Sequence, residues 1–140
     1  MNYKVVYFSR TGTSKRVAEK IANKLSCEAV KITDNMNWDG VLGFIKGGYY
    51  AVRKKDVKIE INGNIDDADE IILVTPLWAN RPAPAIEAFY QKMPLDKIHL
   101  VVTSNASKIK EHLAFKSLSE IIKNKNNEDL IIETLVNKLL

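Results

Sequence analysis

Four hydroxyl side chains and one glycine stand together near the amino end of the chain, directly before a segment with helical spacing. The first N–H groups of a helix have no partner inside the helix and carry partial positive charge. Hydroxyls add further donors, and a glycine lets the backbone come close to a bound group. The segment therefore predicts a nest for a phosphate; the alternative, an ordinary helix cap, needs only one hydroxyl. Its residues are Ser9, Arg10, Thr11, Gly12, Thr13 and Ser14.

A tryptophan among three prolines forms a second candidate segment. Pro76, Pro82 and Pro84 stiffen the backbone around Trp78 and would hold the indole at the edge of a ligand. An indole beside a phosphate nest suggests stacking on a flat aromatic ring. The alternative is that Trp78 packs under its loop as part of the core. The candidate ligand-binding residues of this segment are Thr75, Pro76, Leu77, Trp78, Ala79 and Asn80.

Other kinds of site lack their motifs. Neither G-x-x-x-x-G-K-[ST] nor G-x-G-x-x-G follows the first apolar run, which argues against a nucleoside-triphosphatase loop and an NAD fingerprint. The single cysteine, Cys27, excludes a disulfide framework and a multi-cysteine metal site. We expect His99 and His112 to be surface or packing groups, and the acidic residues of 66–70 to be solvated. No catalytic residue set and no metal site is predicted.

Composition is that of a small globular protein with a basic surplus. The chain has 140 residues, 21 Lys and Arg against 17 Asp and Glu, and a formal net charge of +4. Its length fits one domain over residues 1–140. Apolar runs stop at four to six residues, which argues against a membrane span, and the amino end does not resemble a signal peptide. We therefore expect a cytoplasmic protein, with nucleic acid and membrane as unfavoured partners.

Apolar spacing predicts the elements that would position these segments. Short continuous apolar runs indicate buried strands, and stripes at helical spacing indicate helices between them. The expected strands are 4–8, 28–33, 69–75, 98–103 and 130–132, and the expected helices are 13–25, 39–53, 84–92 and 113–123.

Strictly alternating strands and helices predict an α/β fold with a doubly wound, five-stranded parallel sheet. Buried parallel strands need helical crossovers on both faces, and right-handed crossovers fit the flavodoxin-like order 2-1-3-4-5. Ligands of such folds bind at the carboxyl ends of the strands. The residues just after Phe8, Thr75 and Thr103 should therefore form the site, and Thr103, Ser104 and Asn105 join the candidates.

Two of these segments resemble the flavodoxin family. Residues 9–14 are similar to its [ST]-x-T-G-x-T phosphate loop, and residues 75–84 resemble the loop after the third strand in short bacterial and archaeal members. Residues 43–53 echo a helix motif of the same branch. The resemblance implies bound FMN and electron transfer. Residues 9–14 would hold the ribityl phosphate, and residues 77–80 would line the isoalloxazine ring.

The sequence also departs from the family. The loop after Thr103 lacks the Gly-Asp pair and the stacking tyrosine of many flavodoxins, so the ring would be covered on one face only. The chain is basic, with a pI of about 9.1, where flavodoxins are usually acidic. Residues 133–140 leave room for a stub only, so we expect the last helix to be truncated or missing. The bare sheet face would then favour a homodimer.

The function that fits best is an FMN-binding electron carrier, a flavoprotein of electron transport, with a redox partner protein of unknown identity. Arg10 and Arg81 are candidates to raise the potential of the flavin by stabilising its anionic reduced form. One alternative is a small NAD(P)H-dependent FMN or quinone reductase, an oxidoreductase with its own substrate. The other is a flavin-free interaction domain of the same fold.

Overall fold

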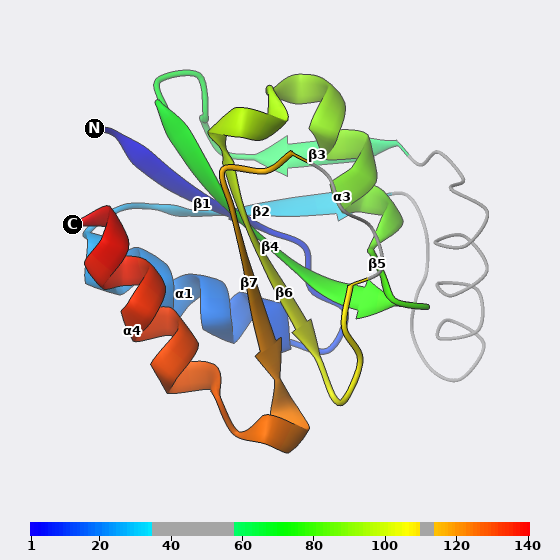
Figure 1. The fold of residues 1–140 in the computed structure, drawn as a ribbon. Helices are drawn as coiled ribbons and strands as arrows, with labels where there is room; N and C mark the ends of the chain where they lie inside the picture. Colours follow the sequence, from blue (N-terminus) through cyan, green and yellow to red (C-terminus); the bar gives the residue numbers. More distant parts are fainter. Residues whose placement is uncertain (35–57, 110–113) are drawn as a thin grey trace.

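In the computed structural model the chain forms a twisted sheet with helices packed on its faces (Figure 1). Residues 1–34, 58–109 and 114–140 are described. The predicted helix 39–53, the motif 43–53 and His112 lie outside them. The strands are β1 (Tyr3–Tyr7), β2 (Ala29–Asp34), β3 (Ile59–Asn62), β4 (Glu70–Trp78), β5 (Arg81–Pro82), β6 (Ile98–Ser104) and β7 (Ser117–Ile122). The helices are α1 (Thr13–Leu25), α3 (Pro84–Phe89) and α4 (Glu128–Leu139), with short 3-10 turns at Tyr90–Lys92, Leu95–Lys97 and Lys123–Lys125.

The strand order confirms the α/β fold class. The sheet runs β3-β2-β1-β4-β6-β7, and the five strands from β2 to β7 in this order pair in parallel. Counting only these five, the order is 2-1-3-4-5 as expected, but the fifth strand is β7 and not the predicted strand 130–132. Three strands were not predicted. Strand β7 lies where a helix was expected, β3 pairs antiparallel with the outer side of β2, and the two-residue β5 pairs antiparallel with the end of β4.

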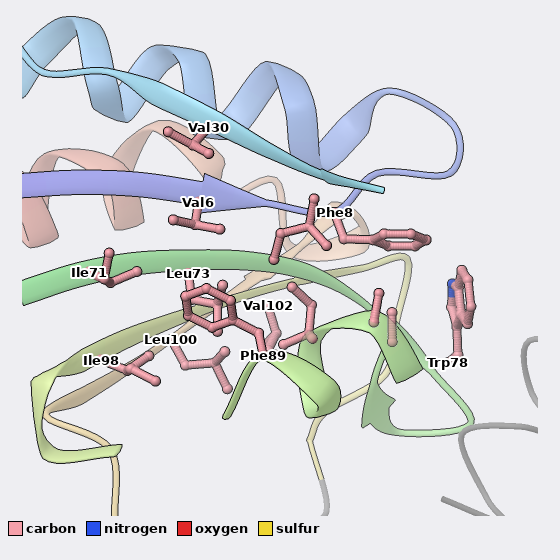
Figure 2. Packing of buried hydrophobic residues seen from close by; sticks show 14 of the residues in the cluster. Val6, Phe8, Val30, Ile71, Leu73, Trp78, Phe89, Ile98, Leu100 and Val102 are labelled. Carbon is pink, nitrogen blue, oxygen red and sulfur yellow. The ribbon is translucent and has the colours of Figure 1, made fainter. Parts of the chain in front are cut away.

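Hydrophobic packing on both faces holds this sheet. On one face, Phe89 of α3 lies over Leu73 of β4 and Leu100 of β6, and all three side chains are fully buried (Figure 2). On the other face, α1 and α4 lie side by side (Figure 1). Ile21 of α1 and Ile132 of α4 belong to the apolar cluster there. Burial on both faces explains why β1, β4 and β6 are nearly continuous apolar runs.

The prediction for the last third of the chain was wrong in two places. Residues 113–123, predicted as a helix, contain strand β7, and residues 130–132, predicted as a strand, lie inside helix α4. The apolar residues Leu118, Ile121 and Ile122 have helical spacing, but Ile121 and Ile122 are the buried end of a strand paired with β6. Short apolar runs fit either structure, and pairing with β6 decides between them.

The last helix is therefore neither truncated nor missing. Helix α4 has twelve residues and buries Ile132, Leu135 and Val136 against α1 and the sheet. It covers the face that the sequence analysis expected to be bare. The expectation of a homodimer rested on a bare sheet face, so it loses its basis.

A buried polar chain crosses the amino ends of three strands. Glu70 of β4, His99 of β6 and Ser117 of β7 are linked: His99 Nε2 donates to Glu70 Oε1 at 2.6 Å, and His99 Nδ1 and Ser117 Oγ are 2.8 Å apart. Lys116 Nζ lies 3.5 Å from Glu70 Oε2. Glu70 and His99 are both buried, so the expectation of a solvated carboxylate was wrong for Glu70, and His99 is a packing group that holds a carboxylate.

The pKa of Glu70 reports two opposing effects. Burial raises it, but the hydrogen bond from His99 and the positive charge of nearby Lys116 help to outweigh burial and lower it below the ordinary value of 4.5. A carboxyl group whose pKa is lowered by folding stabilises the folded state above its unfolded pKa. That contribution is lost as the pH falls through the folded-state value.

Replacing Leu135 by Ala should lower the free energy of unfolding by about 3 kcal/mol, because the truncated side chain leaves a cavity between α4 and the sheet. Leu130→Ala on the exposed side of the same helix is the matched control and should cost less than about 0.5 kcal/mol. Urea unfolding measures both. Equal costs for the two variants would contradict the packing of α4.

Replacing Glu70 by Gln should lower the free energy of unfolding at pH 7 by about 1 kcal/mol, because a charge-assisted hydrogen bond becomes a neutral one. The difference from the wild type should shrink as the pH falls below the ordinary carboxyl value of 4.5 and through the lower folded-state pKa of Glu70. Urea unfolding at several pH values tests this, with Glu60→Gln on exposed β3 as the control. A difference that does not change with pH would count against the Glu70–His99 pairing.

Candidate ligand-binding site

A cavity of about 1060 Å³ opens at the carboxyl edge of the parallel strands. Its volume is at the upper end of the usual range for small-molecule sites. Three segments that are far apart in the sequence meet in its wall, as the expected strand order predicts: the β1–α1 loop, the end of β4 with its hairpin, and the end of β6. The predicted residues that line it are Arg10, Thr11, Thr13, Pro76, Leu77, Trp78, Ala79, Asn80, Thr103, Ser104 and Asn105.

The β1–α1 loop is shaped by Ser9 and Gly12. The Gly12 backbone N–H donates to Ser9 Oγ at 2.9 Å, and Gly12 has a left-handed φ of +98° at the N-cap of α1. No side-chain hydrogen bond caps the helix. Thr11 and Thr13 on either side of Gly12 are both exposed and line the cavity.

Two predicted residues lie below the loop instead of in the cavity wall. Ser14 is buried, and its Oγ lies 3.1 Å from Thr103 Oγ1 at the end of β6. Thr75 is also buried: its hydroxyl donates to the Pro76 carbonyl at 2.9 Å and accepts the Ala83 N–H at 3.1 Å. The Ser14–Thr103 contact joins α1 to β6, and the Thr75 hydroxyl joins β4 to Ala83 directly before α3. Ser9, Gly12, Ser14 and Thr75 thus shape the site without lining it.

The proline-rich segment, expected to be a loop after its strand, is a β-hairpin. Strand β4 continues to Trp78, and Ala79 and Asn80 form a two-residue turn to β5. Both turn residues have positive φ, +52° and +63°, as the tight turns of twisted hairpins require. Asn80 Nδ2 donates to the Lys108 carbonyl at 2.9 Å, which ties the hairpin to the segment after β6.

Trp78 takes part in both the cavity wall and the core. Its ring meets Phe8 edge to face, with centroids 5.7 Å apart and planes at 81°, and only 8% of the residue is exposed (Figure 2). The alternative predicted from the sequence, that Trp78 packs under its loop as part of the core, thus describes part of its role. Arg10 also lines the cavity, whereas Arg81 lies on β5 opposite Trp78 and is not one of the lining residues.

A fourth segment of the wall was missed by the sequence analysis. The turn from β7 to α4 contributes Ile121, Ile122, Lys123, Asn126, Asn127 and Glu128, and the cavity is completed by Arg16 and Ser107. Assigning residues 113–123 to a helix hid this turn. The available signal was Asn127 followed by Glu128 and Asp129, a pattern typical of a helix start.

Side-chain hydrogen bonds hold this turn in place. Asn127 Oδ1 accepts the Ile122 N–H at 2.9 Å, and Asn127 Nδ2 donates to the Glu120 carbonyl at 3.2 Å. The Asn124 N–H donates to the Asn105 carbonyl at 2.9 Å, which joins the turn to the end of β6. The wall on this side is therefore fixed by two independent attachments.

Charge at the rim comes from both signs. Burial raises the pKa of Glu128, but hydrogen bonds and charge from Lys20 and Arg16 outweigh burial and hold it below the usual range. Glu128 is thus ionised at neutral pH.

In the described part of the chain no group of three His, Cys, Asp or Glu side chains could hold a metal ion. None of the helices within residues 1–34, 58–109 and 114–140 is long and apolar enough to cross a membrane.

Solved structures share this fold over nearly the whole chain. A flavoprotein in complex with FMN from Lactobacillus acidophilus has a TM-score of 0.66 at 19% identity, covering 93% of this chain and 97% of its own. A candidate flavoprotein from Bacteroides eggerthii has a TM-score of 0.69 at 19% identity, covering 97% and 96%. Another from Bacteroides uniformis has a TM-score of 0.68 at 18% identity, covering 93% and 97%. No protein-family model and no curated protein matches the sequence.

Replacing Gly12 by Ala should lower the free energy of unfolding by about 1–2 kcal/mol, because a side chain with a Cβ is strained at this φ. No heavy atom lies within 4 Å of the added Cβ, so the backbone alone accounts for the cost. Gly12→Asn is the matched control, since Asn adopts this conformation more readily. Urea unfolding should rank the wild type first, the Asn variant second and the Ala variant last. An Ala variant as stable as the wild type would refute the left-handed turn.

Proposed function

We propose that the cavity binds FMN noncovalently and that the protein transfers electrons through it. The observation that carries the proposal is the meeting, in one cavity, of a helix N-terminus rimmed with hydroxyls and a wall that contains an indole. The first suits a phosphate and the second suits a flat aromatic ring. FMN has both groups, one at each end of a ribityl chain.

The phosphate would be held at the start of α1. The first N–H groups of that helix have no acceptor within the helix, and the left-handed Gly12 is its N-cap residue. The hydroxyls of Thr11 and Thr13 face the same cavity and are available as further donors. A phosphate dianion needs several donors at once, and this arrangement offers backbone and side-chain donors together.

The ring would lie along the hairpin between β4 and β5. Leu77 and Trp78 supply apolar surface that excludes water from one side of a flat ligand, and Ala79 leaves room at the turn. Amide side chains of Asn80 and Asn105 stand at the wall with donors and acceptors for polar atoms at a ring edge. The Asn80 side chain is already oriented by its bond to Lys108.

Similarity to known structures supports this proposal. One neighbour of the same fold, from Lactobacillus acidophilus, was crystallised in complex with FMN, and it covers 93% of this chain. The flavodoxin-like motifs of residues 9–14 and 75–84 lie in the cavity wall or directly below it. Sequence motif, fold and cavity therefore agree on the same class of ligand.

An electron carrier fits the wall better than an enzyme with its own substrate. When bound, the flavin supplies the one- or two-electron chemistry, and the protein sets affinity and potential. Glu128 is the one carboxylate among the described residues of the wall, and it is held by ion pairs instead of being poised for proton transfer. A redox partner protein would exchange electrons at the open edge. The alternative, a small NAD(P)H-dependent reductase, predicts turnover that the carrier does not.

Titration of the protein into FMN should quench flavin fluorescence with a one-to-one end point. Riboflavin should bind at least about tenfold more weakly, because it lacks the phosphate that the start of α1 would hold. Lys31→Gln on the exposed side of β2 is the control and should bind FMN like the wild type. Steady NAD(P)H oxidation by the FMN-loaded protein would favour the reductase. No quenching and no shift of the absorbance spectrum would exclude both flavin functions.

A further inference from the structure

Three charged side chains join α1 to α4 at the rim of the cavity. Arg16 Nη2 pairs with Glu128 Oε1, and Lys20 Nζ pairs with Glu128 Oε2 at 2.7 Å. Glu128 is the first residue of α4 and is 23% exposed, while Arg16 is half exposed. The carboxylate therefore has two cations, one on each oxygen.

Arg16 is close to the phosphate nest. Its backbone N–H donates to the Gly12 carbonyl at 3.0 Å, so it stands on the first turn after the loop. Its side chain lines the same cavity as Thr11 and Thr13. A guanidinium at this place can reach an anion bound at the start of α1, and its planar fork suits phosphate oxygens.

Glu128 faces the same cavity as a fixed negative charge. Asn127 holds the preceding turn through two hydrogen bonds, so the carboxylate cannot leave without disturbing the start of α4. A phosphate dianion entering the nest meets this charge and is repelled by it. Carboxylate and phosphate also compete for the same guanidinium.

We propose that Arg16 is a phosphate-binding residue of the FMN site and that Glu128 competes with the phosphate for Arg16. When the ligand binds, Arg16 leaves Glu128 and binds the phosphate instead. The inference rests on the proposed function of this site. Lys20 makes the exchange possible: it stays on the second carboxylate oxygen, so Glu128 is never left partly buried and unpaired. The contribution of this exchange to the affinity for the ligand depends on the charge of the ligand's phosphate and not on its ring.

Fluorescence titration with FMN and with riboflavin, at one salt concentration, tests the exchange. Glu128→Gln keeps the shape of the side chain and removes the competitor, so it should bind FMN about tenfold more tightly. Arg16→Gln should bind FMN about tenfold more weakly. Neither variant should change the affinity for riboflavin. In the double variant that carries both Arg16→Gln and Glu128→Gln, there is no Arg16 side chain to be released. Adding Glu128→Gln to Arg16→Gln should therefore raise the logarithm of the FMN affinity by at most half as much as it does in the wild type.

Asp129→Asn is the matched control. Asp129 follows Glu128 in α4 and also lies near Lys20, at 3.3 Å, but it is 89% exposed and does not line the cavity. This variant should bind FMN like the wild type. Urea unfolding of every variant verifies that each is folded under the conditions of the titration.

The outcomes separate this inference from the proposed function. FMN binding that Glu128→Gln leaves unchanged or weakens, or that changes together with riboflavin binding, overturns the exchange and leaves the FMN site standing. If the wild type binds neither flavin, the FMN proposal fails. The exchange is then judged with inorganic phosphate at constant ionic strength. Phosphate should raise the thermal unfolding temperature most in Glu128→Gln and least in Arg16→Gln. The same response in all variants, or none, overturns it.

Discussion

Parallel pairing of β1, β4 and β6 is the constraint on which the rest of this structure depends. Parallel strands bring all their carboxyl ends to one edge, and the connection that leaves each strand starts there. The start of α1 is therefore fixed beside the ends of β4 and β6. The buried hydroxyl pair of Ser14 and Thr103 joins α1 to β6 directly. Apolar burial on both faces keeps this geometry rigid, and the cavity is the space left where the loops diverge.

Two additions to this plan determine the character of the cavity. The hairpin of β4 and β5 extends one wall beyond the sheet and places Trp78 against Phe8, so that part of the indole packs in the core. The turn from β7 to α4 closes the opposite side and brings Glu128 next to Arg16. One wall is mainly apolar and the other is charged. A ligand with a flat ring and an anionic end matches this division.

The sequence was sufficient to predict an element where one physical signal dominated. Strands such as residues 71–74 are apolar on both faces and admit few other structures, and the stripe of residues 13–25 matches α1 at both ends. It was insufficient where short apolar runs fit both the helix period and the strand period. Residues 118–122 were predicted as helix and residues 130–132 as strand, whereas pairing with β6 makes the first a strand and the second lies in α4. The contact between Glu70 and His99 joins residues 29 positions apart, and no local pattern encodes it. For the same reason the predicted site contained three walls of the cavity but not the fourth, which depends on α4.

The central claim is that the start of α1 holds the phosphate of FMN. A crystal structure of the protein grown with FMN tests it most directly. The account predicts the phosphate within hydrogen-bonding distance of the first N–H groups of α1 and of the hydroxyls of Thr11 and Thr13, with the ring beside the β4–β5 hairpin. A structure in which FMN is absent from this cavity, or lies in it with its phosphate away from α1, would contradict the account.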